Sequence, residues 1–218
     1  MKLKSIHWAA ASILLGAVLA EPAAADDNKF YLKLGSSTLV PMEGATIAAG
    51  GSIVPGGTIS LANHTTLGLE AGYHLTPNWS VGLAAGVPPT IDIYGAGSLA
   101  GLGKLGTITY GPAALTAQYT FTNFGRIQPY VGAGPLYMFV FSNKGGAVEN
   151  LKVDPAWGAV VHAGVDVDLT DHWGVYVDVK KSFLRTAASG TLGAGGPPIL
   201  ADVKLDPWVF GTGLKYRF

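Results

Sequence analysis

The chain ends in the segment Trp208-Val209-Phe210-Gly211-Thr212-Gly213-Leu214-Lys215-Tyr216-Arg217-Phe218. One phase of its two-residue alternation is apolar and largely aromatic, and it includes Phe210, Leu214, Tyr216 and Phe218. A strand of this kind can face lipid on one side and a polar lumen on the other. An aromatic residue at its end is typical of the closing strand of a bacterial outer-membrane β-barrel. We therefore interpret Tyr216 and Phe218 as an assembly signal.

The first 25 residues have the pattern of a secretory signal peptide. Lys2 and Lys4 precede an uncharged apolar run over residues 6–19, and Ala23-Ala24-Ala25 offers a small-residue cleavage site. The apolar run is too short to span a bilayer as a helix, which disfavours a retained membrane anchor. We expect residues 1–25 to be removed on export and residues 26–218 to form one domain.

The composition favours a membrane barrel over a soluble protein. Hydrophobic residues make up 49% of the chain and charged residues 13%, yet no segment has the length and apolarity of a transmembrane helix. In lipid, only helices and closed sheets satisfy every backbone polar group. The formal net charge of zero leaves no basic field that would recruit nucleic acid, and the lack of cysteine excludes disulfides and thiol chemistry. We expect no cofactor and no metal.

Eight segments show two-residue alternation, and they are 29–34, 65–75, 79–87, 107–121, 127–141, 157–169, 173–183 and 203–218. Tight connections at 76–78, 122–126 and 170–172 alternate with longer ones at about 35–64, 88–106, 142–156 and 184–202. This asymmetry is typical of outer-membrane barrels, with short periplasmic turns and long extracellular loops. The predicted fold is all-β, an eight-stranded antiparallel transmembrane β-barrel in the outer membrane of a Gram-negative bacterium.

Charges set the phase of each strand. In segment 65–75, Leu67 and Leu69 share one face and Glu70 and His74 share the other, so we assign the first face to lipid and the second to the lumen. A soluble barrel such as a lipocalin would reverse these faces. The signal peptide and the terminal aromatic residue disfavour that alternative. Aromatic residues near both ends of the outward faces predict two interfacial girdles.

Several strings together resemble the outer-membrane protein W (OmpW) family, and they are Pro41–Ala45, Pro129–Gly134, Trp157-Gly158 with Ala163–Asp166, Val203–Phe210 and Tyr216–Phe218. The resemblance runs from about Phe30 to Phe218. It implies an eight-stranded barrel with a hydrophobic lumen, associated with the movement of small apolar compounds across the outer membrane. The string Tyr110-Gly111-Pro112-Ala113 departs from the Leu-Pro-Pro of the family, and Ala84 is smaller than the aliphatic residue expected there. Both changes concern the width of the passage.

The inward residues divide by height into two groups. On the loop side they form an apolar funnel of Ala84, Leu136, Met138, Val140, Val160, Leu205 and Val209. On the turn side they form a charged plug of Lys33, Glu70, Asp166, Asp168, Asp178, Lys180, Lys215 and Arg217. An eight-stranded barrel is just wide enough for side chains to fill it, so these charges should pair. For Asp166 the expected partner is Lys215 or Lys180.

Two residues are candidates for a constriction of the funnel, Ala84 and Trp157. Strict alternation from His162 and Asp166 turns Trp157 toward lipid as a girdle residue. The family resemblance instead implies a lumen position, which would require a β-bulge near Ala159. Both orientations remain open from the sequence.

Catalytic patterns are weak. His64 in a predicted loop could serve a hydrolase, but nothing couples it to a particular nucleophile and acid. Asp166 and Asp168 share a face with cations at the same depth, which favours salt bridges over paired catalytic carboxylates. Segment 193–196 is glycine-rich but lacks the lysine and the strand-to-helix context of a phosphate-binding loop. We therefore expect no enzyme, and a lipid-modifying barrel enzyme is the least favoured alternative.

The favoured function is a channel that passes small hydrophobic molecules through an apolar lumen and releases them sideways into the membrane. Pro88-Pro89, Pro112 and Pro135 could weaken strand pairing on one side, although they could equally just end strands. A structural or adhesive surface barrel with a closed interior is the main alternative. The expected partners are outer-membrane lipid and lipopolysaccharide, the barrel-assembly machinery and small hydrophobic solutes, with no nucleic acid.

Overall fold

The structure is a computed structural model that describes residues 29–218, so the predicted signal peptide over residues 1–25 lies outside the described residues. The strands are β1 (Phe30–Val40), β2 (Glu43–Ala49), β3 (Ser52–Ile53), β4 (Gly57–Leu61), β5 (His64–His74), β6 (Trp79–Gly86), β7 (Thr90–Gly97), β8 (Lys104–Thr120), β9 (Ile127–Gly145), β10 (Val148–Val153), β11 (Ala156–Asp168), β12 (Trp173–Leu192), β13 (Pro198–Leu205) and β14 (Trp208–Arg217). Two 3₁₀ turns, η1 (Ala100–Leu102) and η2 (Thr122–Phe124), complete the described elements.

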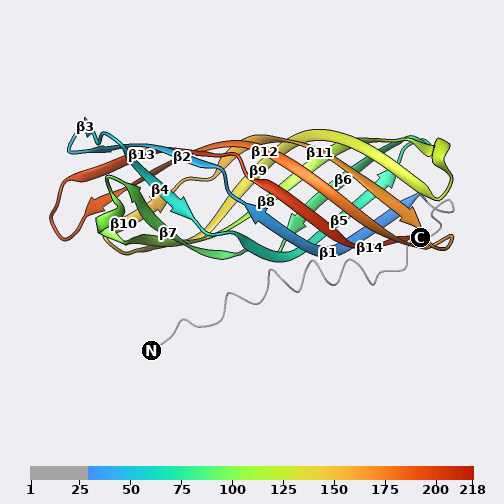
Figure 1. The fold of residues 1–218 in the computed structure, drawn as a ribbon, viewed down its shortest axis with the longest axis horizontal. Coiled ribbons are helices and arrows are strands. Elements are labelled where there is room, and N and C mark those ends of the chain that lie inside the picture. Colours follow the sequence, from blue (N-terminus) through green and yellow to red (C-terminus); the bar gives the residue numbers. More distant parts are fainter. Residues whose placement is uncertain (1–28) are drawn as a thin grey trace, which may run out of the picture.

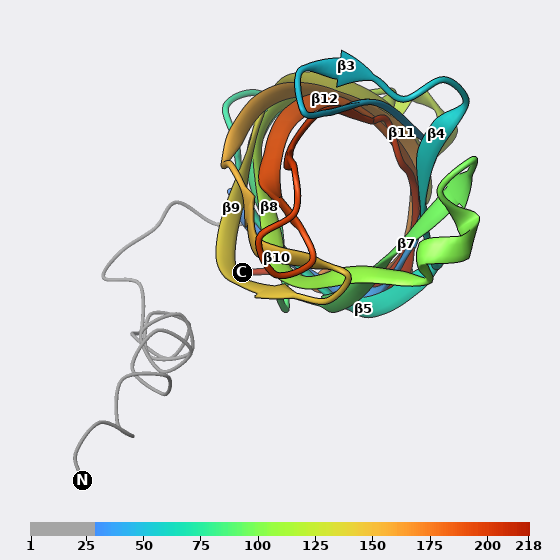
Figure 2. The ribbon, with the colours of Figure 1, turned by 90° about the vertical axis from the view of Figure 1, so that its left-hand side faces the viewer.

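Eight of these strands close into an antiparallel barrel, in the order β1, β5, β6, β8, β9, β11, β12, β14. Closure comes from β14, which pairs with β12 on one side and with β1 on the other. Figure 2 shows the resulting ring from the loop end. The closed ring of eight antiparallel strands confirms the predicted fold class. Closure leaves no free strand edge in lipid.

The long connections are themselves largely strands, which the sequence interpretation missed. Beyond the eight-stranded part, β13 pairs with β2 and β12, β10 pairs with β12, and β7 pairs with β4 and β8. These additional strands prolong the barrel wall on the loop side (Figure 1). The prediction that 35–64, 88–106, 142–156 and 184–202 are simple loops is therefore wrong. Each of the extra strands, β2, β3, β4, β7, β10 and β13, spans eight residues or fewer.

Five of the eight barrel strands are interrupted at the boundary between the spanning part and the loop-side part. We call this level the junction, and it consists of the breaks at 41–42, 62–63, 87–89, 154–155 and 206–207. The predicted single strand 203–218 is accordingly two strands, β13 and β14. Proline occurs at four of the five breaks, and it cannot donate a hydrogen bond to the ladder.

The two faces of each spanning strand have opposite polarity. On β8, Leu115 points outward and is 55% exposed, whereas Gln118 points inward and is 2% exposed. A buried amide and an exposed leucine suit a strand between lipid and a polar lumen, and are the reverse of a soluble barrel. Over residues 29–218, no helix is long and apolar enough to cross a membrane.

Tight turns join the spanning strands at the other end, and two of them share one design. Thr76 Oγ1 accepts hydrogen bonds from the backbone nitrogens of Asn78 (3.3 Å) and Trp79 (2.9 Å). Thr170 Oγ1 likewise accepts hydrogen bonds from the backbone nitrogens of His172 (3.4 Å) and Trp173 (2.9 Å). The threonine hydroxyl thereby fixes the turn locally.

Aromatic side chains gather near both ends of the outward face. At the turn end, Trp79 contacts Tyr119, and Trp173 contacts Tyr216, with ring centroids 5.2 and 4.7 Å apart. Toward the junction, the Tyr137 ring contacts Phe139 (4.7 Å) and Trp157 (4.8 Å). These two bands have the arrangement of interfacial girdles.

Candidate functional site

The loop-side half of the barrel encloses an apolar space, which we call the outer cavity. Its volume is about 310 Å³, and its lining includes Ile47, Ile59, Ile93, Leu105, Val153 and Val203. Those side chains belong to one cluster of buried hydrophobic residues. They come mostly from the strands that the sequence interpretation took for loops. The alternation of Ile91 with Ile93, or of Ala45 with Ile47, was the signal that could have indicated an inward face.

A second space, the middle cavity, lies below the outer cavity and has a volume of about 140 Å³. It shares Leu61, Ile108 and Leu205 with the outer cavity, so the two adjoin. Of the predicted funnel residues, its lining contains Ala84, Leu136, Met138, Val160, Leu205 and Val209. Val140, the remaining funnel residue, packs against the apolar cluster of the loop-side half. All seven lie inside the barrel, but the funnel extends farther outward than predicted.

A small base pocket of about 50 Å³ separates the middle cavity from the charged residues below. Ala84 lines both spaces, and therefore lies where the passage changes from apolar to charged. Its role as a constriction remains a prediction. Lys180, Glu70 and Asp178 face the pocket from the turn side.

The charged residues below the base pocket form what we call the ion network. Its centre is Asp166, which is fully buried. One carboxylate oxygen lies 2.8 Å from Lys33 Nζ, and the other accepts a hydrogen bond from Lys215 Nζ at 2.6 Å. Asp166 thus pairs with Lys215 as expected, but its second partner is Lys33 instead of Lys180.

Lys180 belongs to a neighbouring part of the ion network. Its Nζ lies 2.8 Å from Asp178 Oδ1 and 3.4 Å from Glu70 Oε2. Asp178 also lies 3.2 Å from His162 Nδ1 through its other oxygen. Nearer the turns, Arg217 Nη2 donates to both oxygens of Asp168 at 2.9 and 2.8 Å. Every predicted plug residue therefore has an opposite charge within 4 Å.

Three tyrosines brace the ion network, and the sequence interpretation did not single them out for this role. Tyr31 Oη donates to Glu70 Oε1 (3.1 Å), and Tyr130 Oη donates to Asp178 Oδ2 (3.0 Å). Lys33 Nζ lies 4.0 Å from the centre of the Tyr130 ring and 5.4 Å from that of Tyr176, within cation–π range. The sequence did contain a signal for this role. Tyr31 lies two residues before Lys33 and Tyr176 two residues before Asp178, so alternation places each tyrosine on the inward face.

Glycine makes room for the Tyr31 ring. A Cβ atom on Gly72, which faces it from β5, would lie 2.2 Å from Tyr31 Cζ. Any side chain at position 72 would therefore displace the ring from the lumen. The filled cross-section depends on this close approach.

The lumen placement of Trp157 is wrong. Its side chain is 72% exposed on the outer surface, and its ring contacts that of Tyr137 at a tilted angle. The ladders of β11 with β9 and β12 are continuous, so the bulge near Ala159 that a lumen position requires is not formed. Unbroken alternation places Trp157 outside, as a girdle residue.

The barrel wall is weakened beside the middle cavity. The ladder of β6 with β8 ends at the pair Ala85–Ala113, and the ladder of β7 with β8 begins only at Thr90–Thr109. Segment 86–89 lies between them, and its Val87 and Pro89 line the cavity together with Pro112 of β8. None of the three prolines at positions 88, 89 and 112 can donate to a ladder. We call this place the wall gap.

An ion pair and a hydrogen bond tie β7 to β8 above the wall gap. Asp92 Oδ1 lies 2.7 Å from Lys104 Nζ and accepts a hydrogen bond from Thr107 Oγ1 at 2.8 Å. The hydrogen bond from Lys104, followed by the one from Thr107, holds the pKa of the Asp92 carboxyl below its usual range. The upper edge of the gap is therefore anchored.

The catalytic candidates are not brought together into a recognisable set. His64 is half-buried at the start of β5 and is the register partner of Leu39. Asp166 and Asp168 are engaged by cations, as described above. Over residues 29–218, no three His, Cys, Asp or Glu side chains gather in a way that could hold a metal ion.

Comparison with known proteins agrees with this geometry. The model of the OmpW family matches residues 26–218. The chain belongs to the OmpW family. It is 34% identical to Outer membrane protein W of Escherichia coli, with 100% of this chain and 99% of that protein covered. It is 32% identical to the Dibenzothiophene metabolism operon protein PahQ of Pseudomonas aeruginosa, with coverage of 92% and 93%.

A solved structure shares the fold. The crystal structure of the outer-membrane protein OprG from Pseudomonas aeruginosa aligns with a TM-score of 0.82 at 27% identity, covering 89% of this chain and 98% of that one. The spanning strands, girdles and closed wall described above are thus those of an outer-membrane barrel of the OmpW family.

Proposed function

We propose that this OmpW-family barrel is a channel for small hydrophobic molecules, which enter at the outer mouth and leave through the wall gap into the membrane. The observation that carries the proposal is the division of the lumen. Two adjoining apolar cavities end on a largely buried ion network in which each charge has a partner of opposite sign. An apolar solute is solvated by the first part and excluded by the second. The relationship to a protein named for a dibenzothiophene metabolism operon supports this substrate class.

A charge placed in the middle cavity should reduce passage. We expect Met138→Lys and Leu136→Asp to lower uptake of small hydrocarbons about ten-fold or more, because a buried charge penalises a neighbouring apolar solute by at least about 1.4 kcal/mol. The measurement is whole-cell uptake at matched surface expression, beside a strain lacking the protein. Tyr94→Lys is the control, since Tyr94 lies on the exposed outer face of β7. Equal uptake in all strains would leave the alternative of a surface barrel that only displays its outer part.

Lateral exit is supported by the contact between the middle cavity and the wall gap. Val87 lines the cavity and is also 56% exposed on the outside. Pro88 and Phe141 cover the same place, since a Cβ on Gly111 would lie 3.3 and 3.1 Å from them. The ion network below offers no comparable apolar route.

Closing the wall gap with a disulfide should block exit reversibly. The chain has no cysteine, so Gly86→Cys/Pro112→Cys introduces a unique pair across the gap. We expect the oxidised variant to take up hydrocarbons about as poorly as the strain lacking the protein, and reduction to restore uptake. The matched control is Val81→Cys/Ala117→Cys, an outward-facing register pair in the intact ladder of the same two strands. Undiminished uptake by the oxidised gap variant, with the bridge verified by mass, would exclude this exit.

A further inference from the structure

Two cations oppose each other directly on the outer surface of the loop-side half. Arg185 of β12 and Lys204 of β13 are register partners in an antiparallel pair, and both side chains are exposed on the outward face. Like charges in this position destabilise a sheet. Lys181, four residues before Arg185 on the same face, adds a third cation, with its Nζ 4.9 Å from the Trp208 ring centre. We call these three residues the cationic patch.

The protein itself neutralises the cationic patch only in part. Lys204 Nζ lies 3.1 Å from Asp206 Oδ2, while the other oxygen of that carboxylate accepts a hydrogen bond from Leu184 N. Lys181 donates to the backbone oxygen of Asp206, not to its carboxylate. Over the described residues, Arg185 has no ion pair. Asp202 is exposed on the same face, two residues farther from the membrane than Lys204.

The depth of the cationic patch is fixed by aromatic residues. Phe183 lies two residues before Arg185 on β12, faces outward and is exposed, as are Trp208 of β14 and Trp157 of β11. Exposed aromatic side chains of this kind mark the boundary between acyl chains and headgroups. Arg185 and Lys204 therefore extend from the wall at the level of the outer-leaflet headgroups, and they face away from the lumen that solutes would use.

We propose that the cationic patch binds a phosphate group of lipid A, the acylated and phosphorylated disaccharide of the outer leaflet. The planar guanidinium of Arg185 can hold two phosphate oxygens, and Lys204 opposite supplies a compact second charge. A bound phosphate attracts both cations and so offsets the repulsion between them. The neighbouring aromatic side chains then contact the acyl chains of the same lipid.

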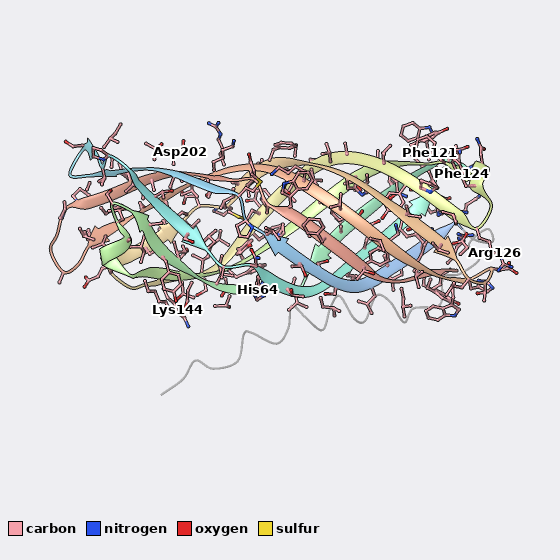
Figure 3. All side chains as sticks on the ribbon, viewed as in Figure 1. His64, Phe121, Phe124, Arg126, Lys144 and Asp202 are labelled. Carbon is pink, nitrogen blue, oxygen red and sulfur yellow. The ribbon has the colours of Figure 1, made fainter. Side chains whose placement is uncertain are left out.

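The test compares lipid A with its dephosphorylated form. Purified barrel in detergent is titrated with each lipid, and binding is measured by native mass spectrometry. Arg185→Gln/Lys204→Gln should weaken binding of lipid A roughly thirty-fold, since each cation near an anionic surface contributes roughly five-fold. Lys144→Gln is the matched control, because Lys144 lies on the opposite edge of the loop-side half from Asp202 in Figure 3.

A second readout protects the test against a folding defect. Without lipid A, the double variant should melt at the same temperature as the wild type or higher, because the like-charge pair is gone. With lipid A, the wild type should gain thermal stability that the double variant lacks. Equal binding of the dephosphorylated lipid, equal affinity of the double variant, or displacement of lipid A by millimolar inorganic phosphate would each overturn the proposal. None of these outcomes depends on whether the lumen conducts solutes.

Discussion

Asp166→Ala should lower the free energy of unfolding of the barrel by about 3–5 kcal/mol. The reason is the pair of ammonium groups that the substitution leaves behind. Lys33 and Lys215 are 2% and 3% exposed, and both are held by the Asp166 carboxylate. Removing one partner of a buried ion pair strands the other, which is more costly than replacing the whole pair with apolar groups.

The measurement is reversible unfolding in urea, in detergent micelles or lipid bilayers. Asp168→Ala is the control, because the side chains of Asp168 and Arg217 are 17% and 21% exposed and a more hydrated pair should lose only about 1 kcal/mol. Adding Lys33→Met to Asp166→Ala should recover part of the loss. An unchanged unfolding free energy for Asp166→Ala would mean that water enters the lower lumen and screens its charges.

Deletion of Phe218 should reduce the amount of folded barrel in the outer membrane severalfold. The Phe218 backbone nitrogen donates to Phe30 O at 3.0 Å, next to the ladder that joins β14 to β1. Its ring packs edge-on against Tyr216, which in turn contacts Trp173. The deletion thus removes a hydrogen bond at the closing seam and the end of an aromatic ladder, where each unpaired backbone group in lipid costs several kcal/mol.

Phe218→Ala separates the two contributions, since it keeps the backbone and loses the ring. We expect an intermediate level, measured from the heat-modifiable folded band on gels of isolated outer membranes. Phe124→Ala is the control, because Phe124 is an exposed aromatic residue of turn η2, which joins β8 to β9 on the other side of the barrel from the seam between β14 and β1. Wild-type levels after deletion of Phe218 would contradict its assignment as an assembly signal.

The spanning strands could be predicted from the sequence because lipid imposes a strict rule on their outer face. The outward residues between the girdles carry no charge, so a single inward Glu70 or Asp166 fixes the phase of a whole strand. The rule does not apply to the loop-side strands, because they extend beyond the lipid. There the outside faces water and the inside is apolar, and the strands are short and interrupted at the junction.

The sequence predicted which residues line the lumen, but not which charged residues pair with one another. Alternation and height placed Lys33 and Lys180 in the lower lumen, yet the choice between them for Asp166 depends on the stagger of strands around the barrel. Trp157 shows the opposite case. Local phase alone oriented it correctly, and the resemblance to the family suggested a position that the continuous ladders do not allow.

The junction has a consequence for how such barrels diversify. Five strands break at one level, so the segments above it are joined to the spanning part mainly by short connections and by three uninterrupted strands, β8, β9 and β12. Insertions or exchanges above that level leave the register of every spanning strand untouched. A chimera that carries the outer segments of one relative on the spanning part of another should thus inherit its cargo preference from the first and its biogenesis from the second.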